Sequence, residues 1–399
     1  SLVCRSFYFR LVLVFCVCAC SFSGTSTTFG AQWSVEPRLR SEGQFKDNLL
    51  LTTLSHHSVW AMKISPSVGM SYATEILNLK GSPKFEYVRY FSRDPIEKTF
   101  NNYYFPFSGS HRTEVDRLGL DVAINRDNAL ISELDETGLV TNFTPRNFRN
   151  VRGGWDRSVT ERTTLKSSYQ FTDVSYDRAR GSNLFAYQAH TGTVGAAYQW
   201  TEETSFHSTA WYTNYHVPQN GFRSQAPGLE LGFSQRMSET FSISGSGGLR
   251  YVWTTFPVNG QSRKNTDLTW LFNVSLDREW ERSHITVRYS RTLNPSGLGI
   301  LFVTDRVDLG VNHQLTHALS ISLRGTFSDN DTVGSSSDSR GIVNSRYWQV
   351  GPTISWRVTE YWSFDLSYDY VRLEGKTTAE SNAVIMGLTY TWPKWAVSR

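Results

Sequence analysis

The chain has 399 residues, a formal net charge of +4 at pH 7, 14% aromatic residues and 19% charged residues, with a mean hydropathy of −0.37. This near-neutral balance argues against binding to nucleic acid or to a strongly charged partner. A helical membrane protein would need apolar runs of about 20 residues, and the chain has none beyond its amino-terminal segment.

The amino-terminal segment predicts export. Arg5 and Arg10 precede the longest apolar run, 11–19, which is too short to cross a bilayer as a helix. We expect a signal peptide over 1–31, so that the mature chain begins near Gln32 with a formal charge of about +2.

Other readings of this segment stay open. Cleavage after Ser21 is an alternative, and Cys20 lies in a weak lipoprotein-like cleavage box. All four cysteines lie in the segment, so stability of the mature chain is not expected to come from disulfide bonds. They are Cys4, Cys16, Cys18 and Cys20.

Short segments that alternate apolar and polar residues fill most of the mature chain. In the segment 241–253, Phe241, Leu249 and Trp253 share one side of a strand. Serines, glycines and Arg250 share the other side. A two-residue period places successive side chains on opposite faces of a sheet. Over so many segments it predicts an all-β, transmembrane, antiparallel up-and-down β-barrel with lipid outside and water inside.

Eighteen strands are predicted, an even number as in single-chain bacterial barrels. Sixteen is an alternative, because Glu133 and Asp135 interrupt the alternation of 129–138. One barrel domain is expected to span 32–395. The predicted strands are 33–44, 58–72, 76–91, 109–125, 129–138, 148–159, 163–176, 186–200, 204–217, 226–237, 240–255, 266–277, 283–293, 300–315, 318–328, 341–357, 361–372 and 381–392.

The connections alternate between two kinds. Short turns contain Thr and Glu, such as Thr160-Glu161 and Thr201-Glu202, whereas the others are longer and polar. Short periplasmic turns and longer external loops are typical of outer-membrane barrels, so we expect the chain in the outer membrane of a Gram-negative bacterium. Tryptophans beside the short turns and the carboxyl end predict an interfacial girdle. It comprises Trp200, Trp280, Trp356, Trp362 and Trp392.

The polar sides of the predicted strands place charges of both signs in the lumen. Rings of fixed charge in a pore select the solutes that pass, although opposite charges on neighbouring strands can also simply pair. The residues predicted to face the lumen are Lys80, Lys84, Arg117, Asp121, Arg152, Asp156, Arg250, Arg288, Arg306, Asp308, Arg324, Asp365 and Asp369.

The segment 92–108 is the predicted constriction. It is long, and it carries five aromatic residues that favour burial over exposure, so we expect it to fold into the lumen and narrow it. They are Phe100, Tyr103, Tyr104, Phe105 and Phe107.

An outer-membrane lipid enzyme is a less favoured alternative. His313 and Ser320 lie near one predicted turn, but nucleophilic catalysis also needs a third, orienting group. Neither G-x-S-x-G nor H-E-x-x-H is present. The pair His56-His57 is expected in a solvated external loop. We therefore predict no catalytic residue, no metal site and no cofactor.

Three stretches of the chain carry a resemblance to known barrels. They are Trp33-x-Val35-x-Pro37 with 45–48, the run 126–138, and 160–165 continuing to 169–176. These stretches resemble the β-barrel porin 2 group and the barrels encoded beside exosortase (PEP-CTERM) and exopolysaccharide gene clusters. The resemblance covers nearly the whole mature chain, but its motifs are structural, and it carries over no active-site residue. One departure is the carboxyl end, where Trp392 is followed by seven residues instead of ending the chain.

The expected function is a porin-like channel that passes solutes or exopolysaccharide through a polar lumen. The resemblance implies an alternative, a non-conducting barrel that serves an exopolysaccharide secretion system and engages periplasmic polysaccharide-export proteins through the Thr-Glu turns. The expected partners are outer-membrane lipid and polysaccharide or small polar solutes, with no nucleic acid. The solute and the oligomeric state are left open.

Overall fold

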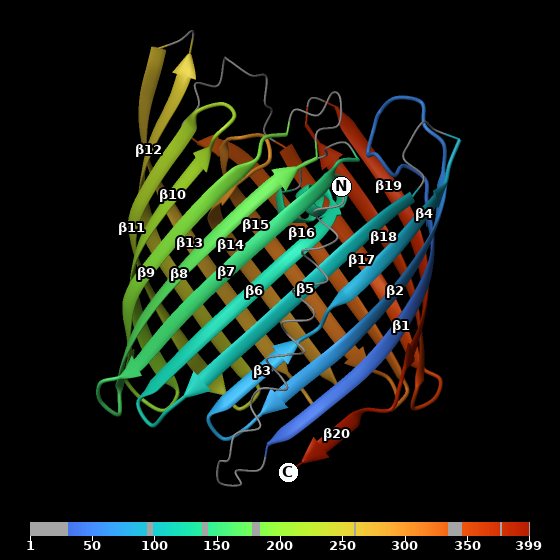
Figure 1. Cartoon of the computed structure of the whole chain (residues 1–399), viewed down its shortest axis with the longest axis horizontal. Coiled ribbons are helices and arrows are strands. Elements are labelled where there is room, and N and C mark those ends of the chain that lie inside the picture. The colour runs from blue at the N-terminus through green and yellow to red at the C-terminus, as the bar shows by residue number, and fades with distance from the viewer. Residues whose placement is uncertain are drawn as a thin grey trace, which may run out of the picture.

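The chain folds into a closed, antiparallel β-barrel (Figure 1). The computed structural model describes residues 31–93, 99–137, 143–177, 184–258, 261–333, 345–375 and 377–398. Residues 1–30, with most of the predicted signal peptide and all four cysteines, lie outside the described residues. The elements are β1 (Gln32–Lys46), β2 (Val59–Ala73), β3 (Leu77–Gly81), β4 (Lys84–Phe91), β5 (Thr99–Arg112), β6 (Asp116–Asn128), α2 (Ala129–Thr137), β7 (Pro145–Ser158), β8 (Thr163–Tyr176), β9 (Tyr187–Gln199), β10 (Thr204–Val217), β11 (Phe222–Ser238), β12 (Phe241–Val258), β13 (Gln261–Glu279), β14 (Ser283–Pro295), β15 (Leu301–Gln314), β16 (Leu319–Val333), β17 (Ser345–Arg357), β18 (Trp362–Glu374), β19 (Thr378–Thr391) and β20 (Trp395–Ser398).

The first and last strands close the barrel. β1 pairs with β2 along its whole length and with β19 from Arg38 to Lys46. β20 takes over from β19 and pairs with residues 32–35 of β1. β3 and β4 share the position between β2 and β5. The described residues therefore form eighteen strand positions, which confirms the predicted fold class and strand number.

Two of the predicted strands are nevertheless wrong, and their errors cancel in the count. In place of the strand predicted at 129–138, residues 129–137 form the helix α2, because Asn128 caps it through a bond from the Leu130 N–H to its Oδ1. Residue 138 lies outside the described residues. The segment 109–125 is the end of β5, a turn at 113–115 and most of β6. A strand at 99–112 was missed. Because residues 99–112 form the strand β5, the aromatic residues of 99–108 lie in the barrel wall and do not form the predicted inward loop.

A threonine shapes most of the short turns. Its Oγ1 accepts a hydrogen bond of 2.9–3.0 Å from the backbone N–H three residues on, which fixes the turn with a side chain in place of a longer loop. These turns lie at the lower rim in Figure 1, and the longer connections lie at the upper rim. The threonines are Thr74, Thr113, Thr160, Thr201, Thr316 and Thr359.

The outer face of the barrel is an exposed apolar belt. Leu231 is 61% exposed, Leu249 is 55% exposed and Leu268 is 65% exposed, and they lie on consecutive strands. Such a surface is stable only against lipid. All five tryptophans of the predicted girdle are exposed beside short turns or the carboxyl end. Among the described residues, no helix is long and apolar enough to cross a membrane.

Replacing Leu231 with Arg tests which face meets lipid. We expect L231R to lose about 2–4 kcal/mol of unfolding free energy in a bilayer, because a charged side chain near mid-membrane must be desolvated. The measurement is reversible urea unfolding in lipid vesicles. The control is S246R on the inward side of β12, which is expected to cost much less. Equal losses for the two variants would contradict this assignment of faces.

Candidate functional site

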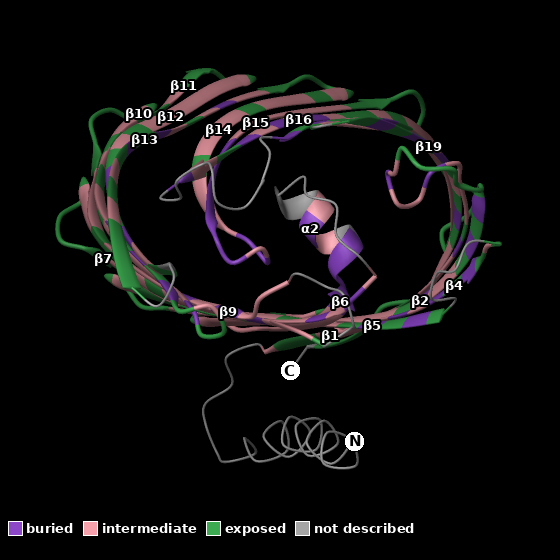
Figure 2. Ribbon diagram, turned by 90° about the horizontal axis from the view of Figure 1, so that it is seen from above, coloured by how far each residue is buried: buried purple, intermediate pink, exposed green. Residues whose placement is uncertain are grey.

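The inward face of the barrel carries the charged side chains. On each strand they alternate with the exposed apolar residues, and α2 lies inside the ring of strands that they line (Figure 2). The thirteen charged residues predicted for the lumen, eight of them basic and five acidic, alternate along their strands with apolar residues, as that prediction requires. They are Lys80, Lys84, Arg117, Asp121, Arg152, Asp156, Arg250, Arg288, Arg306, Asp308, Arg324, Asp365 and Asp369.

Some of these residues are brought together in pairs across neighbouring strands. Arg117 stands opposite Asp156, and Asp121 stands opposite Arg152, in the register of β6 and β7. On the far wall Asp308 accepts bonds from Arg306 Nε at 2.9 Å and from Thr326 Oγ1 at 2.9 Å. Charges of both signs therefore stand opposite each other here, and this part of the lumen is polar without a large excess of either sign.

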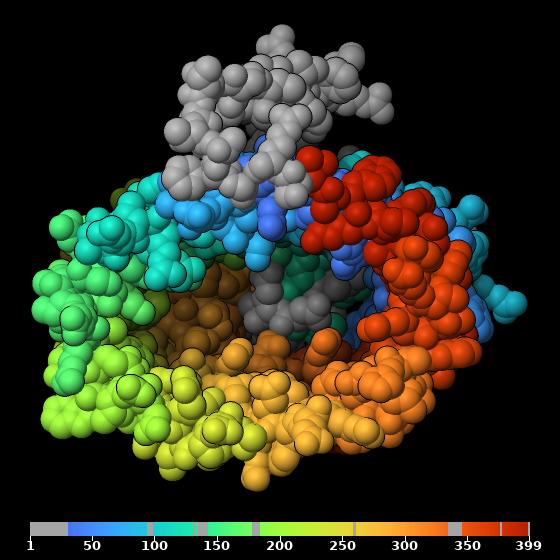
Figure 3. Space-filling model, turned by 90° about the horizontal axis from the view of Figure 1, so that it is seen from below, coloured from blue at the N-terminus to red at the C-terminus, as the bar shows by residue number. Residues whose placement is uncertain are grey.

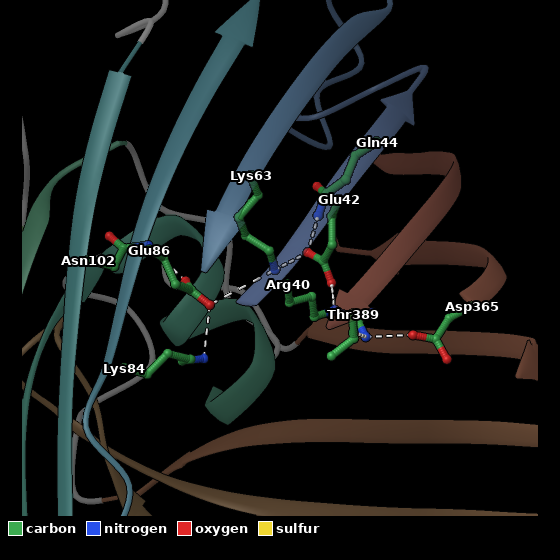
Figure 4. A network of polar contacts seen from close by, with 9 residues as sticks. All are labelled: Arg40, Glu42, Gln44, Lys63, Lys84, Glu86, Asn102, Asp365 and Thr389. Carbon is green, nitrogen blue, oxygen red and sulfur yellow. Dashed lines mark hydrogen bonds and ion pairs between the residues drawn. The ribbon is translucent and has the colours of Figure 1, made fainter. Parts of the chain in front are cut away.

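A ladder of alternating charges crosses the seam where β1 and β19 meet (Figure 4). Lys84 Nζ lies 2.9 Å from Glu86 Oε1, Lys63 lies between Glu86 and Glu42, and Glu42 also pairs with Arg40 at 2.5 Å. Arg40 Nη1 then reaches over β19 to Asp365 Oδ2 at 2.5 Å. The ladder thus runs from β4 through β2 and β1 to β18.

One glycine makes the last step of this ladder possible. A Cβ at Gly387 on β19 would lie 2.7 Å from Arg40 Nη2 and 3.4 Å from Asp365 Oδ2. Any larger residue would separate the two charges. Arg40, Glu42 and Lys63 were not among the residues predicted to face the lumen. Every second residue from 34 to 44 is polar or charged, a pattern that marks Arg40 and Glu42 as inward.

The helix α2 is fastened to the inner wall by buried charges. Arg146 on β7 and Glu133 on α2 are each 2% exposed, and their nearest charged atoms lie 3.6 Å apart. Arg146 Nε also donates to Asp127 Oδ1 at 3.1 Å, and Tyr176 Oη donates to Glu133 Oε1 at 2.5 Å. Removing one member of such a buried cluster leaves an uncompensated charge, so the helix has a strongly preferred position.

A second inward segment is the connection 296–300 between β14 and β15. Tyr215 Oη donates to the carbonyl of Ser296 at 3.2 Å, and Ile300 is 1% exposed. A Cβ at Gly297 would lie 2.4 Å from Tyr176 Oη. Tyr176 therefore touches both inward segments. Apolar side chains of the upper wall pack beneath this connection, among them Phe222, Phe302 and Val252.

Two of the described segments, α2 and the connection 296–300, are held on the inner side of the barrel wall. From the lower rim the molecule is hollow between the strand walls (Figure 3), whereas α2 projects into the ring when the barrel is viewed from above (Figure 2). The narrowing predicted from 92–108 is thus provided by α2 and the connection 296–300. The broken alternation of 129–138 is a sequence signal for α2. No sequence pattern indicates where this helix packs against the wall.

Arg250 has an unusual position on the inner wall. Its guanidinium lies 4.6 Å from the ring centroid of Trp211. A Cβ at Gly228 would lie 2.3 Å from Arg250 Cδ, so the missing side chain lets the arginine lie flat on the wall. A cation over an indole ring is stabilised electrostatically, so the buried Arg250 side chain is held against the inner wall by Trp211.

The residues considered for catalysis are arranged differently from the prediction. His313 Nδ1 bonds to Ser283 Oγ at 2.7 Å, and not to Ser320. Both side chains are on the outward face of the barrel. His56 bonds to the carbonyl of Leu54 in the exposed segment after β1. No cluster of three or more potential metal-binding side chains occurs in the part of the chain that the structure describes.

Comparisons with known proteins find similar solved structures. No family model and no curated protein matches the chain. OccK5 (OpdH) of Pseudomonas aeruginosa is 10% identical with a TM-score of 0.48, over 91% of this chain and 98% of that one. OccK2 (OpdF) of the same organism is 9% identical with a TM-score of 0.48, over 90% and 97%. The P. aeruginosa outer membrane protein opdK is 9% identical with a TM-score of 0.46, over 90% and 99%.

Asp365→Asn tests the contribution of the charge ladder to closure. We expect a loss of about 1–3 kcal/mol in unfolding free energy, because Arg40 keeps its charge but loses its partner across β19. The measurement is urea unfolding in lipid vesicles. Asp121→Asn is the matched control, since no hydrogen bond or ion pair of Asp121 is seen among the described residues. A loss as large for the control would contradict a special role of the seam.

Proposed function

We propose that the chain is a passive channel of the outer membrane of a Gram-negative bacterium and that it passes small polar solutes. The observation that carries the proposal is an inner wall rich in polar and charged side chains behind an exposed apolar belt. A barrel of 16–18 strands is wide enough to hold an aqueous channel.

The inward segments favour small solutes over a polymer. The helix α2 and the connection 296–300 both project into the lumen and are fixed there by buried contacts. A stiff polysaccharide chain would have to displace them, whereas a small solute can pass beside them. Export of exopolysaccharide, which the resemblance in sequence implies, is therefore the less favoured form of this proposal.

Reconstitution tests the proposal directly. Residues 32–399 are refolded into a planar lipid bilayer, and single-channel current is recorded in simple salt. We expect steady, ohmic current steps. A correctly folded barrel that never conducts would reject the channel and would favour the alternative, a partner-binding component of a secretion system.

We expect a wider channel when the inward helix α2 is removed. Asn128 and Pro145 are register partners of β6 and β7, so residues 129–144 can be replaced by a two-residue Asn-Gly turn without straining the strands. We expect the single-channel conductance to rise by about two-fold or more, because the lumen of a barrel this size is aqueous when nothing projects into it. Glu202→Ala, in a short turn at the other rim, serves as a control for mutation alone. An unchanged conductance would show that α2 does not limit the current.

A further inference from the structure

A polar recess lies in the inner wall across β14 to β18. Its volume is about 280 Å³. Six of its thirteen lining residues carry hydroxyl or amide side chains, and Arg324 and Asp369 supply opposite charges. The hydroxyl and amide residues are Thr286, Asn312, Ser322, Gln349, Thr353 and Ser367.

The two charged side chains in the recess, Arg324 and Asp369, are not joined by an ion pair in the described part of the chain. Among the described residues, neither Arg324 nor Asp369 forms an ion pair or a side-chain hydrogen bond. Arg306 and Asp365, by contrast, are both paired. Arg324 is exposed to the lumen and Asp369 is half-buried. Besides Arg324, Lys46 is the basic residue whose charge acts on Asp369. Both groups thus keep free hydrogen-bonding capacity toward a ligand.

Gly351 forms the wall between the two charges. It is the register partner of Arg324, and a Cβ there would lie 2.4 Å from Asp369 Oδ1. The carboxylate therefore lies against bare backbone, in space that a side chain at 351 would occupy. A second small residue, Gly310, also lines the recess and faces Arg324 from the other side. Small residues on both sides of Arg324 keep the recess open.

We propose that this recess binds a small zwitterionic solute of the amino-acid type, with its carboxylate on Arg324 and its ammonium group on Asp369. This inference rests on the proposed channel function and names the solute class for one subsite in it. A simple anion at Arg324 is repelled by Asp369, and a simple cation at Asp369 is repelled by Arg324. Only a solute that carries both signs is attracted by both groups, and charge-assisted bonds are the stronger class.

The size and lining of the recess agree with this ligand. Pockets for drug-sized ligands begin at roughly 300 Å³, so a recess of about 280 Å³ suits a smaller molecule. The surrounding hydroxyl and amide groups can bond the remaining polar atoms of the solute. Among the described residues that line the recess there is no Phe, Tyr or Trp side chain to stack on a sugar.

Four probes of similar size separate charge from shape. They are L-serine, L-lactate, ethanolammonium and glycerol, each titrated while single-channel current is recorded, with the half-blocking concentration as the readout. Solute line broadening in NMR, with the folded barrel in nanodiscs, measures the same binding without requiring conduction. We expect L-serine to bind at the lowest concentration.

Substitutions of the two charged residues are expected to have opposite effects on the binding of anionic and cationic probes. Arg324→Gln and Asp369→Asn are each expected to raise the half-blocking concentration of L-serine about ten-fold, the loss of one charge-assisted bond. D369N should also strengthen binding of lactate, and R324Q should strengthen binding of ethanolammonium. Gly351→Ala, which keeps both charges but displaces the Asp369 carboxylate, should weaken binding of L-serine as well. Lys166→Gln, an inward cation of β8 outside the recess, should leave L-serine binding unchanged.

The outcomes separate the subsite from the channel. Lactate binding as tight as that of L-serine, or glycerol binding alone, would overturn the proposal in favour of a plain anion or polyol site. Conduction without binding of L-serine would reject the recess and leave the channel standing. Absence of current with L-serine binding that depends on Arg324 and Asp369 would reject the channel and retain the recess.

Discussion

The need to satisfy every backbone hydrogen bond in lipid governs this structure. In a bilayer an open sheet edge is too costly, because no water is there to bond its N–H and C=O groups. β1 must therefore find β19, although more than 330 positions separate their paired residues. The charge ladder lies across this same seam, and Gly387 gives it room. Backbone closure and side-chain pairing thus stabilise the same junction, where the two ends of the chain meet.

Once the barrel is closed, a single alternation produces two different surfaces. Residues that face outward are mostly apolar and those that face inward are mostly polar, so adjacent positions such as Leu323 and Arg324 lie on opposite faces of the barrel wall. The charged side chains of the inner wall also differ in whether they form ion pairs. Charges pair at the seam, whereas Arg324 and Asp369, beside the recess, form no ion pair within the part of the chain that the structure describes. This difference is what separates residues that support the wall from residues available to a solute.

The inward segments turn a wide barrel into a narrower passage. α2 is anchored by Arg146 and Tyr176 through Glu133, and Tyr176 also contacts the connection 296–300. Burying these charges is costly unless all of them find partners, which explains why so few alternative positions are available to the helix. The cluster therefore acts on function by fixing the cross-section that solutes meet.

The sequence by itself determined the barrel, the number of its strands, the sides of the strands and the positions of most short turns, because these depend on a two-residue period and on local threonine bonds. It placed Arg324 and Asp369 on the inward side for the same reason. The strand at 99–112 was missed because the Thr-Glu turn at 113–114 was overlooked. A strand was wrongly predicted at 129–138 because a capped helix interrupts the alternation there. Only the tertiary structure decided that α2 narrows the lumen, that Arg40 meets Asp365, and that Arg324 and Asp369 share one recess. These contacts join residues far apart in the chain, and closure of the barrel, which no local pattern encodes, is what brings them together.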